Sequence, residues 1–112
     1  MNAKSEQAIF EIHADFCHVL SSATRIKILW LLADGAKSVT ELAGALDLSV
    51  PNVSQHLRIM RDRGAVLSRK KGQCVYYSIS NPKFIQGCQL IREGILEQRS
   101  LPISTDLVSE ET

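Results

Sequence analysis

Hydrogen-bonding side chains of several kinds gather in one short stretch of this 112-residue chain. Residues 49–58 carry hydroxyl, amide, imidazole and guanidinium groups, and most of these residues would lie on the outer side of a helix. Asn and Gln can pair with adenine edges, Arg with guanine or a phosphate, and Ser with a base or a phosphate. The candidates for such DNA contacts are Ser49, Asn52, Ser54, Gln55, His56 and Arg58.

Two short helices joined by a tight turn are predicted to position these side chains. Ser38 and Glu41 have the spacing of a capping box, which opens the first helix. Residues 47–48 make the turn. Ser49 is a suitable N-cap for the second helix, and Pro51 falls in its first turn, where a missing N–H costs little.

The second helix is predicted to stop at Gly64 and to bury its other side. Its inward residues recur at helical spacing and are Val50, Val53, Leu57 and Met60. Two helices arranged in this way make a helix-turn-helix, whose second helix can enter a DNA major groove. The alternative is an ordinary helical hairpin with a polar outer side, because such patterns have many false positives.

A basic β-hairpin is predicted directly after these helices. Residues 65–69 and 74–79 have the pattern of strands, and residues 70–73 that of the turn. From Arg58 to Lys71 six basic residues stand against one acidic residue, a local charge of +5 in a chain of net charge +1. This concentration favours a wing that contacts phosphates, with Lys70, Lys71 and Gln73 as candidates. The alternative is a strand edge that lysines keep from aggregating.

Three further helices are predicted, at residues 7–20, 24–33 and 82–98. The helix at 24–33 is apolar on most sides, which indicates a central place in the core. The first and last helices carry apolar stripes that are too wide for a domain of this size to cover. Such helices commonly pair across a two-fold axis. The expected fold is mainly α with a β-hairpin wing, a winged helix-turn-helix in the order ααααββα, and a homodimer through the first and last helices.

The composition is that of one ordinary globular domain, with 45% hydrophobic and 22% charged residues. We expect a flexible N-terminus at residues 1–6, the domain at 7–98 and a disordered acidic tail at 99–112. No signal peptide or membrane-length apolar run is evident, so the expected location is the cytoplasm, without a membrane partner. No phosphate loop, nucleophile elbow or paired carboxylate stands out, so neither an enzyme nor a cofactor is predicted.

Four motifs in order carry a resemblance to a known family: TRIKIL at residues 24–29, SVTELA at 38–43, VSQHLR at 53–58 and GQCVYY at 72–77. Over about residues 8–97 the chain resembles the ArsR/SmtB family of bacterial winged-helix repressors. The resemblance implies a homodimeric repressor whose partner is double-stranded operator DNA. It also implies release from that operator when an inducer binds or modifies the protein, but it does not identify the inducer.

The family's metal sites can be checked position by position. A site made of two cysteines falls here on Ser38 and Thr40, neither of which is a thiolate ligand. A second site, on the last helix, falls on Asn81, Lys83, Gly94 and Glu97. Only Glu97 could coordinate, and one carboxylate cannot hold a zinc ion. No metal is therefore predicted at either site.

A metal or metalloid site near the N-terminus is the weaker alternative. His13 and Cys17 are one helical turn apart, and His18 follows directly. A metal-responsive repressor that uses this cluster stays open as a second function. A third is a winged-helix module that binds protein and has lost DNA binding.

Thiol chemistry is the leading hypothesis for the inducer response. The three cysteines argue against a disulfide framework in a reducing compartment. Some relatives sense persulfides or oxidants by linking a cysteine near the core to one on the last helix. Cys88 matches the cysteine on the last helix. Residues 29–31 (LWL) occupy the usual place of the cysteine near the core, so Cys17 would have to be the partner of Cys88. The alternative is that Cys17 and Cys88 are small buried hydrophobic residues. Cys74 lies on the predicted wing.

Overall fold

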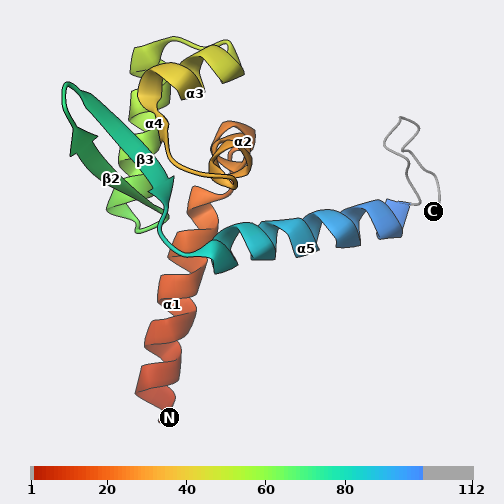
Figure 1. Cartoon of the computed structure of the whole chain (residues 1–112). Helices are drawn as coiled ribbons and strands as arrows, with labels where there is room; N and C mark the ends of the chain where they lie inside the picture. Colours follow the sequence, from red (N-terminus) through yellow and green to blue (C-terminus); the bar gives the residue numbers. More distant parts are fainter. Residues whose placement is uncertain (1, 100–112) are drawn as a thin grey trace.

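The computed structural model describes residues 2–99 (Figure 1). Its elements are, in order, α1 (Ala3–Val19), α2 (Ala23–Leu32), β1 (Lys37–Ser38), α3 (Val39–Leu46), α4 (Val50–Asp62), β2 (Val66–Lys71), β3 (Cys74–Ile79) and α5 (Pro82–Arg99). The predicted fold class, a mainly helical winged helix-turn-helix, is confirmed. The two-residue strand β1 is an addition to the predicted order, because so short a segment has no periodicity to detect.

Helix α1 begins at Ala3, four residues before the predicted start. The Asn2 side chain accepts a hydrogen bond from the Ser5 backbone N–H at 2.9 Å and so satisfies one of the free donors of the first turn. The division between a flexible segment 1–6 and a domain 7–98 stays a prediction. The predicted tail at 99–112 lies outside the described residues, except for Arg99.

The predicted start and stop signals of the helix-turn-helix are confirmed. Ser38 and Glu41 form a reciprocal capping box, with bonds of 3.1 and 2.8 Å. Asp47 ends α3 in the left-handed conformation at φ 57°, which Asp tolerates better than most residues. Ser49 caps α4, and Gly64 follows α4 at φ 84°, a backbone angle that favours glycine.

The sheet has the order β1-β3-β2, with both pairs antiparallel. The predicted four-residue turn is wrong, because Lys70 and Lys71 belong to β2 and Lys71 pairs with Cys74. The turn is Gly72–Gln73 alone. Gly72 has φ 64°, and a glycine with positive φ at the first position permits a two-residue hairpin turn.

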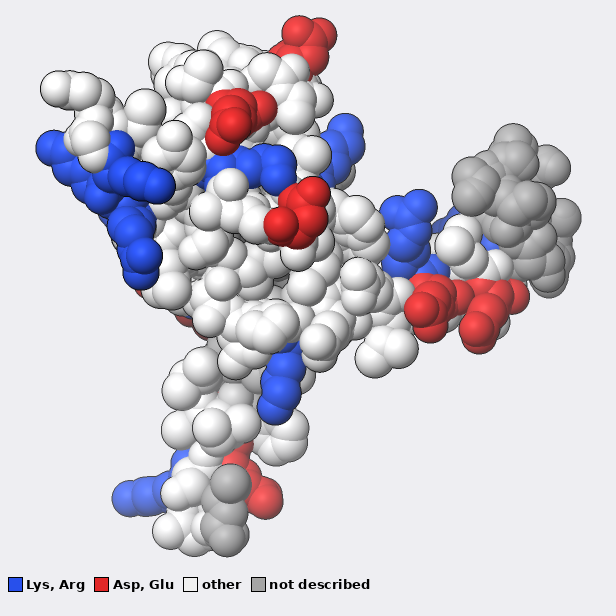
Figure 2. Space-filling view, viewed as in Figure 1, with Lys and Arg blue, Asp and Glu red and all other residues white. Residues whose placement is uncertain are grey.

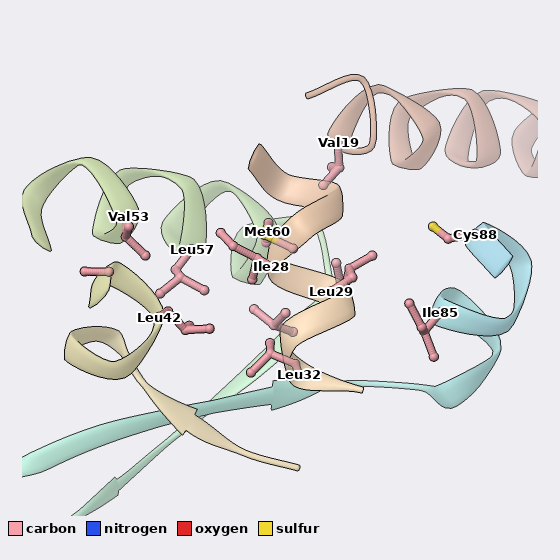
Figure 3. Close-up of a cluster of buried hydrophobic side chains, with 13 residues drawn as sticks. Val19, Ile28, Leu29, Leu32, Leu42, Val53, Leu57, Met60, Ile85 and Cys88 are labelled. Atoms are coloured by element: carbon pink, nitrogen blue, oxygen red, sulfur yellow. The ribbon is translucent and has the colours of Figure 1, made fainter. Parts of the chain in front are cut away.

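The core is built around α2, as predicted. Ile28 and Leu29 are fully buried, and Leu42 from α3 and Leu57 from α4 pack with them (Figure 3). Val50 was expected to face inward, but its exposed fraction is 40%. It is the first residue of α4, where the chain has just left the turn and has not reached the core.

Helices α1 and α5 extend away from this body in two different directions (Figure 1). They meet where the last turns of α1 face the first turns of α5, with the ring centroids of Phe16 and Phe84 4.4 Å apart. Beyond that contact both helices expose large apolar side chains. These are Ile9, Phe10, Ile12, Leu90, Ile91 and Ile95, each at least half exposed.

Candidate nucleic-acid interface

The outer side of α4 carries exposed polar side chains at a spacing of three residues. Asn52, Gln55 and Arg58 are exposed, and Ser54 beside them is half-buried. The opposite side of the same helix is fully buried through Val53, Leu57 and Met60. Because the buried side fixes the rotation of α4, the amide and guanidinium groups point away from the core.

The side chains of three predicted contact residues, Ser49, Gln55 and Arg58, already have hydrogen-bond partners at the start of α4 or within it. The Ser49 hydroxyl oxygen accepts from the Asn52 backbone N–H at 3.2 Å, so Ser49 is the N-cap of the helix. Arg58 Nη1 donates to Gln55 Oε1 at 3.4 Å. This second bond is long and exposed to water, so breaking it costs little. Gln55 and Arg58 therefore stay available to another molecule.

His56 lies at the border of the core, and its ring is half-buried against α2. Its Nδ1 lies 3.4 Å from Nη1 of Arg25, whose Nε donates to the Val19 carbonyl at 2.6 Å. Burial, and secondly the Arg25 charge, lowers the pKa of His56. A neutral ring that accepts from Arg25 at Nδ1 keeps its N–H at Nε2. His56 thus connects α4 to α2 and to the end of α1.

Arg25 is a residue of this region that the sequence interpretation missed. It is half-buried and forms hydrogen bonds to Val19 and His56 at once. The signal was present, because Arg25 is a charged residue at the start of a helix that is otherwise largely apolar. Buried polar groups need partners, which predicts such a network without saying what its members are.

The wing carries exposed Arg69, Lys70 and Lys71 on β2 and exposed Gln73 in the turn. Figure 2 shows blue side chains gathered on the side of the molecule where the wing lies. Successive residues of a strand point to opposite faces, so Lys70 faces away from its two neighbours. The three cations therefore cannot all contact one surface.

Two other basic residues of the +5 stretch are in ion pairs. Arg63 Nη1 lies 2.5 Å from Asp15 Oδ1 on α1, and Arg61 Nη2 lies 3.5 Å from Asp62 Oδ1. These two pairs reduce the charge available for phosphates. Among residues 2–99, the basic residues of this stretch that take part in no ion pair are Arg58, Arg69, Lys70 and Lys71.

The two candidate sensor cysteines differ in exposure. Cys17 on α1 is exposed, whereas Cys88 on α5 is 7% exposed and belongs to the hydrophobic core together with Ile85 (Figure 3). Burial raises the pKa of the Cys88 thiol, and the negative charge of an ionised Cys17 raises it further. Cys17 and Cys88 lie on the two helices that meet at Phe16 and Phe84. Cys74 on the wing is exposed.

The structure does not support the weaker hypothesis of a metal site at His13, Cys17 and His18. Within residues 2–99, no three His, Cys, Asp or Glu side chains lie close enough together to hold a metal ion. His13, Cys17 and His18 are all exposed on α1 and do not form such a group.

None of the described helices has the length and apolar character to cross a membrane.

Comparison with known proteins identifies the family. Residues 22–68 match the model of the bacterial regulatory protein arsR family. The arsenic resistance transcriptional regulator ArsR1 of Pseudomonas putida is 35% identical over 88 residues, which are 78% of this chain and 68% of that protein. The chain also matches two other curated regulators, but it spans only about half of their length, 48% of one and 54% of the other.

Solved structures agree with this result. The crystal structure of Rv0081 from Mycobacterium tuberculosis has a TM-score of 0.75 at 31% identity, over 82% of this chain and 93% of that one. The homodimeric winged helix-turn-helix DNA-binding domain of Mb0332 from Mycobacterium bovis has a TM-score of 0.77 at 25% identity, over 87% and 93%. The chain therefore belongs to the ArsR family of bacterial regulatory proteins, which are winged helix-turn-helix, DNA-binding regulators of transcription.

Proposed function

We propose that this protein is a homodimeric repressor that binds operator DNA through α4 and the wing and leaves it in response to an inducer. The observation that carries the proposal is the exposed row Asn52, Gln55 and Arg58 on α4, with the cations of β2 following it in the chain. The row offers groups that read bases, and the wing offers groups that neutralise phosphates. Such a repressor works where the bacterial chromosome lies, in the cytoplasm.

Dimerisation is supported by the exposed apolar side chains of α1 and α5. Each helix exposes three large apolar side chains within two turns, and such groups on a protein surface mark interaction sites. The related domain of Mb0332 is homodimeric. A two-fold pair would present two copies of α4 to successive major grooves, about 34–36 Å apart.

The inducer response we propose is thiol oxidation. The exposed Cys17 thiolate attacks a peroxide, which leaves a sulfenic acid on Cys17 and releases an alcohol or water. The Cys88 thiol then condenses with it, forming a disulfide and releasing water. The support is the exposure of Cys17, the position of the two cysteines on α1 and α5, and the contact between these helices at Phe16 and Phe84. Closing this bond would shift α1 against α5. Because these two helices form the proposed dimer interface, the distance between the two α4 helices of the dimer would change as well.

The DNA-binding proposal is tested with Gln55→Ala, measured by fluorescence anisotropy on the operator and on random DNA. Loss of one base-reading side chain should cost about 1–3 kcal/mol on the operator and much less on random DNA. Ser54 and His56 would be compared in the same way. An equal loss on both DNAs would show that Gln55 does not read sequence.

The same assay separates DNA binding from the rival function, a winged-helix module that binds protein. Phosphate neutralisation makes the affinity fall steeply as salt rises, by about 0.9 logarithmic units per contact and per tenfold of salt. An affinity for DNA that is weak at low salt and hardly changes with salt would favour the rival.

A further inference from the structure

A pocket of about 350 Å³ opens between α2, α3 and α5, apart from the surface proposed to bind DNA. Five of the seven residues that line the pocket are apolar, and Trp30 is the largest of these five. The remaining two are basic, Lys27 from α2 and Arg92 from α5. The lining residues are Ile26, Lys27, Trp30, Leu31, Ala45, Leu46 and Arg92.

The two cations have no negative partner among the described residues. Neither Lys27 nor Arg92 takes part in an ion pair within residues 2–99, and no carboxylate lines the pocket. The Arg92 guanidinium carbon lies 5.5 Å from the centroid of the Trp30 ring. That contact holds the guanidinium over an apolar wall and leaves its N–H donors for another group.

We propose that this pocket binds a small organic anion with an apolar body, of the class of the arylalkyl carboxylates. The carboxylate would lie between Lys27 and Arg92, where Arg can donate two parallel hydrogen bonds. The apolar body would pack on Trp30 and the aliphatic side chains. Apolar walls with a few polar groups that orient the ligand are typical of small-molecule sites.

The volume of the pocket suits a small ligand. Small-molecule pockets usually have volumes of about 300–1,000 Å³, and this pocket of about 350 Å³ lies at the lower end of that range. A ring, a short linker and a carboxylate fit within a pocket of this size. The site needs only the folded chain, so the proposal goes beyond DNA binding and is testable without DNA.

Trp30 is the single tryptophan of the chain, so its fluorescence reports on the pocket directly. The probe is phenylacetate, added to the full-length protein without DNA, and phenylacetamide is its neutral counterpart of the same shape. We expect a saturable change in emission with the acid and about tenfold weaker binding of the amide, because the charge-assisted bonds are lost. Calorimetry of the same titration provides a second measurement.

Arg92→Gln and Lys27→Gln should each weaken phenylacetate binding by about tenfold. Lys83→Gln is the matched control, since it removes one positive charge from α5 outside the pocket and should leave binding unchanged. Circular dichroism establishes that each variant is folded. Binding that is equal for acid and amide, absent for the acid, or unchanged in Arg92→Gln overturns the proposal.

Two other occupants are tested by the same emission signal. If Leu107→Ser in the full-length chain shifts Trp30 emission without any ligand and lets phenylacetate bind more tightly, the chain's own C-terminal segment occupies the pocket. If phenylacetate binds only to protein diluted to the monomer, a second copy occupies it. Either result overturns the small-anion proposal.

Discussion

The segment from α3 to β3 and the pair of helices α1 and α5 differ in how they cover their apolar residues. In the first segment Leu42, Val53, Leu57 and Met60 are buried by the chain itself. In α1 and α5, apolar side chains such as Phe10 and Leu90 are 66% and 67% exposed. The helix-turn-helix therefore covers its own apolar residues, whereas α1 and α5 carry large apolar side chains that no other part of residues 2–99 covers.

The largest effect is expected from a charge placed on that uncovered surface. Ile91→Asp should give a monomer and reduce operator affinity by about 10²–10⁴, because the two halves no longer bind as a linked pair. Size-exclusion chromatography with light scattering gives the mass, and anisotropy the affinity. Leu67→Asp is the control for dimerisation, since Leu67 is 57% exposed and Ile91 61%. A dimeric Ile91→Asp would contradict the assigned interface.

The self-covered segment should respond through stability instead. Leu57→Ala removes a fully buried side chain and should lower the free energy of unfolding by about 2–5 kcal/mol. Val50→Ala, at a position that is 40% exposed, should cost less than about 1 kcal/mol. Urea unfolding measures both. Similar losses at the two positions would mean that α4 is rotated relative to the described structure.

Both candidate sensor thiols lie in the second of these regions, Cys17 on α1 and Cys88 on α5. We expect peroxide to reduce operator affinity by about 5- to 150-fold, the usual range of coupling between two sites. Cys17→Ser and Cys88→Ser should abolish this loss and leave binding of the untreated protein intact. Cys74→Ser is the matched control, with an exposed thiol outside these helices. If peroxide still releases the Cys88→Ser variant from the operator, the proposed disulfide is not the cause of release.

The burial of Cys88 also predicts which of the two thiols is oxidised first. A raised pKa means that Cys88 is a poor nucleophile near neutral pH, whereas the exposed Cys17 supplies the attacking thiolate. Formation of the sulfenic acid should therefore be lost in Cys17→Ser and kept in Cys88→Ser. Trapping the intermediate with dimedone followed by mass spectrometry measures this. A sulfenic acid that forms first on Cys88 would reverse the assigned roles.

The smallest effect is expected within the wing. Lys70 and Lys71 are neighbours on β2 and point to opposite faces, so only one of them can lie against a given DNA backbone. We therefore expect different results from the two variants Lys70→Ala and Lys71→Ala. One variant should reduce the slope of log affinity against log salt concentration by about 1, and the other should leave this slope unchanged. Equal reductions in the two variants would show that the wing does not lie flat as a strand beside the DNA.

The local part of this fold could be predicted because its signals are local. The capping box of Ser38 and Glu41, the N-cap Ser49 and the stop at Gly64 each depend on residues a few positions apart, and all are present. The buried side of α4 followed from helical periodicity except at Val50. The wing turn was predicted two residues too long, because basic residues in a strand and in a turn look alike in sequence.

Contacts between distant segments were decided only by the tertiary structure. Arg25 meets His56 from 31 positions away, and Asp15 meets Arg63 from 48. The same packing buries Cys88, leaves Cys17 exposed and brings Lys27 and Arg92 to one pocket. None of these pairs has a periodicity or a motif. Residue types and spacing thus determined the helices, their caps and the DNA-contact candidates, whereas burial, pairing of charges and the pocket depend on how the finished helices pack.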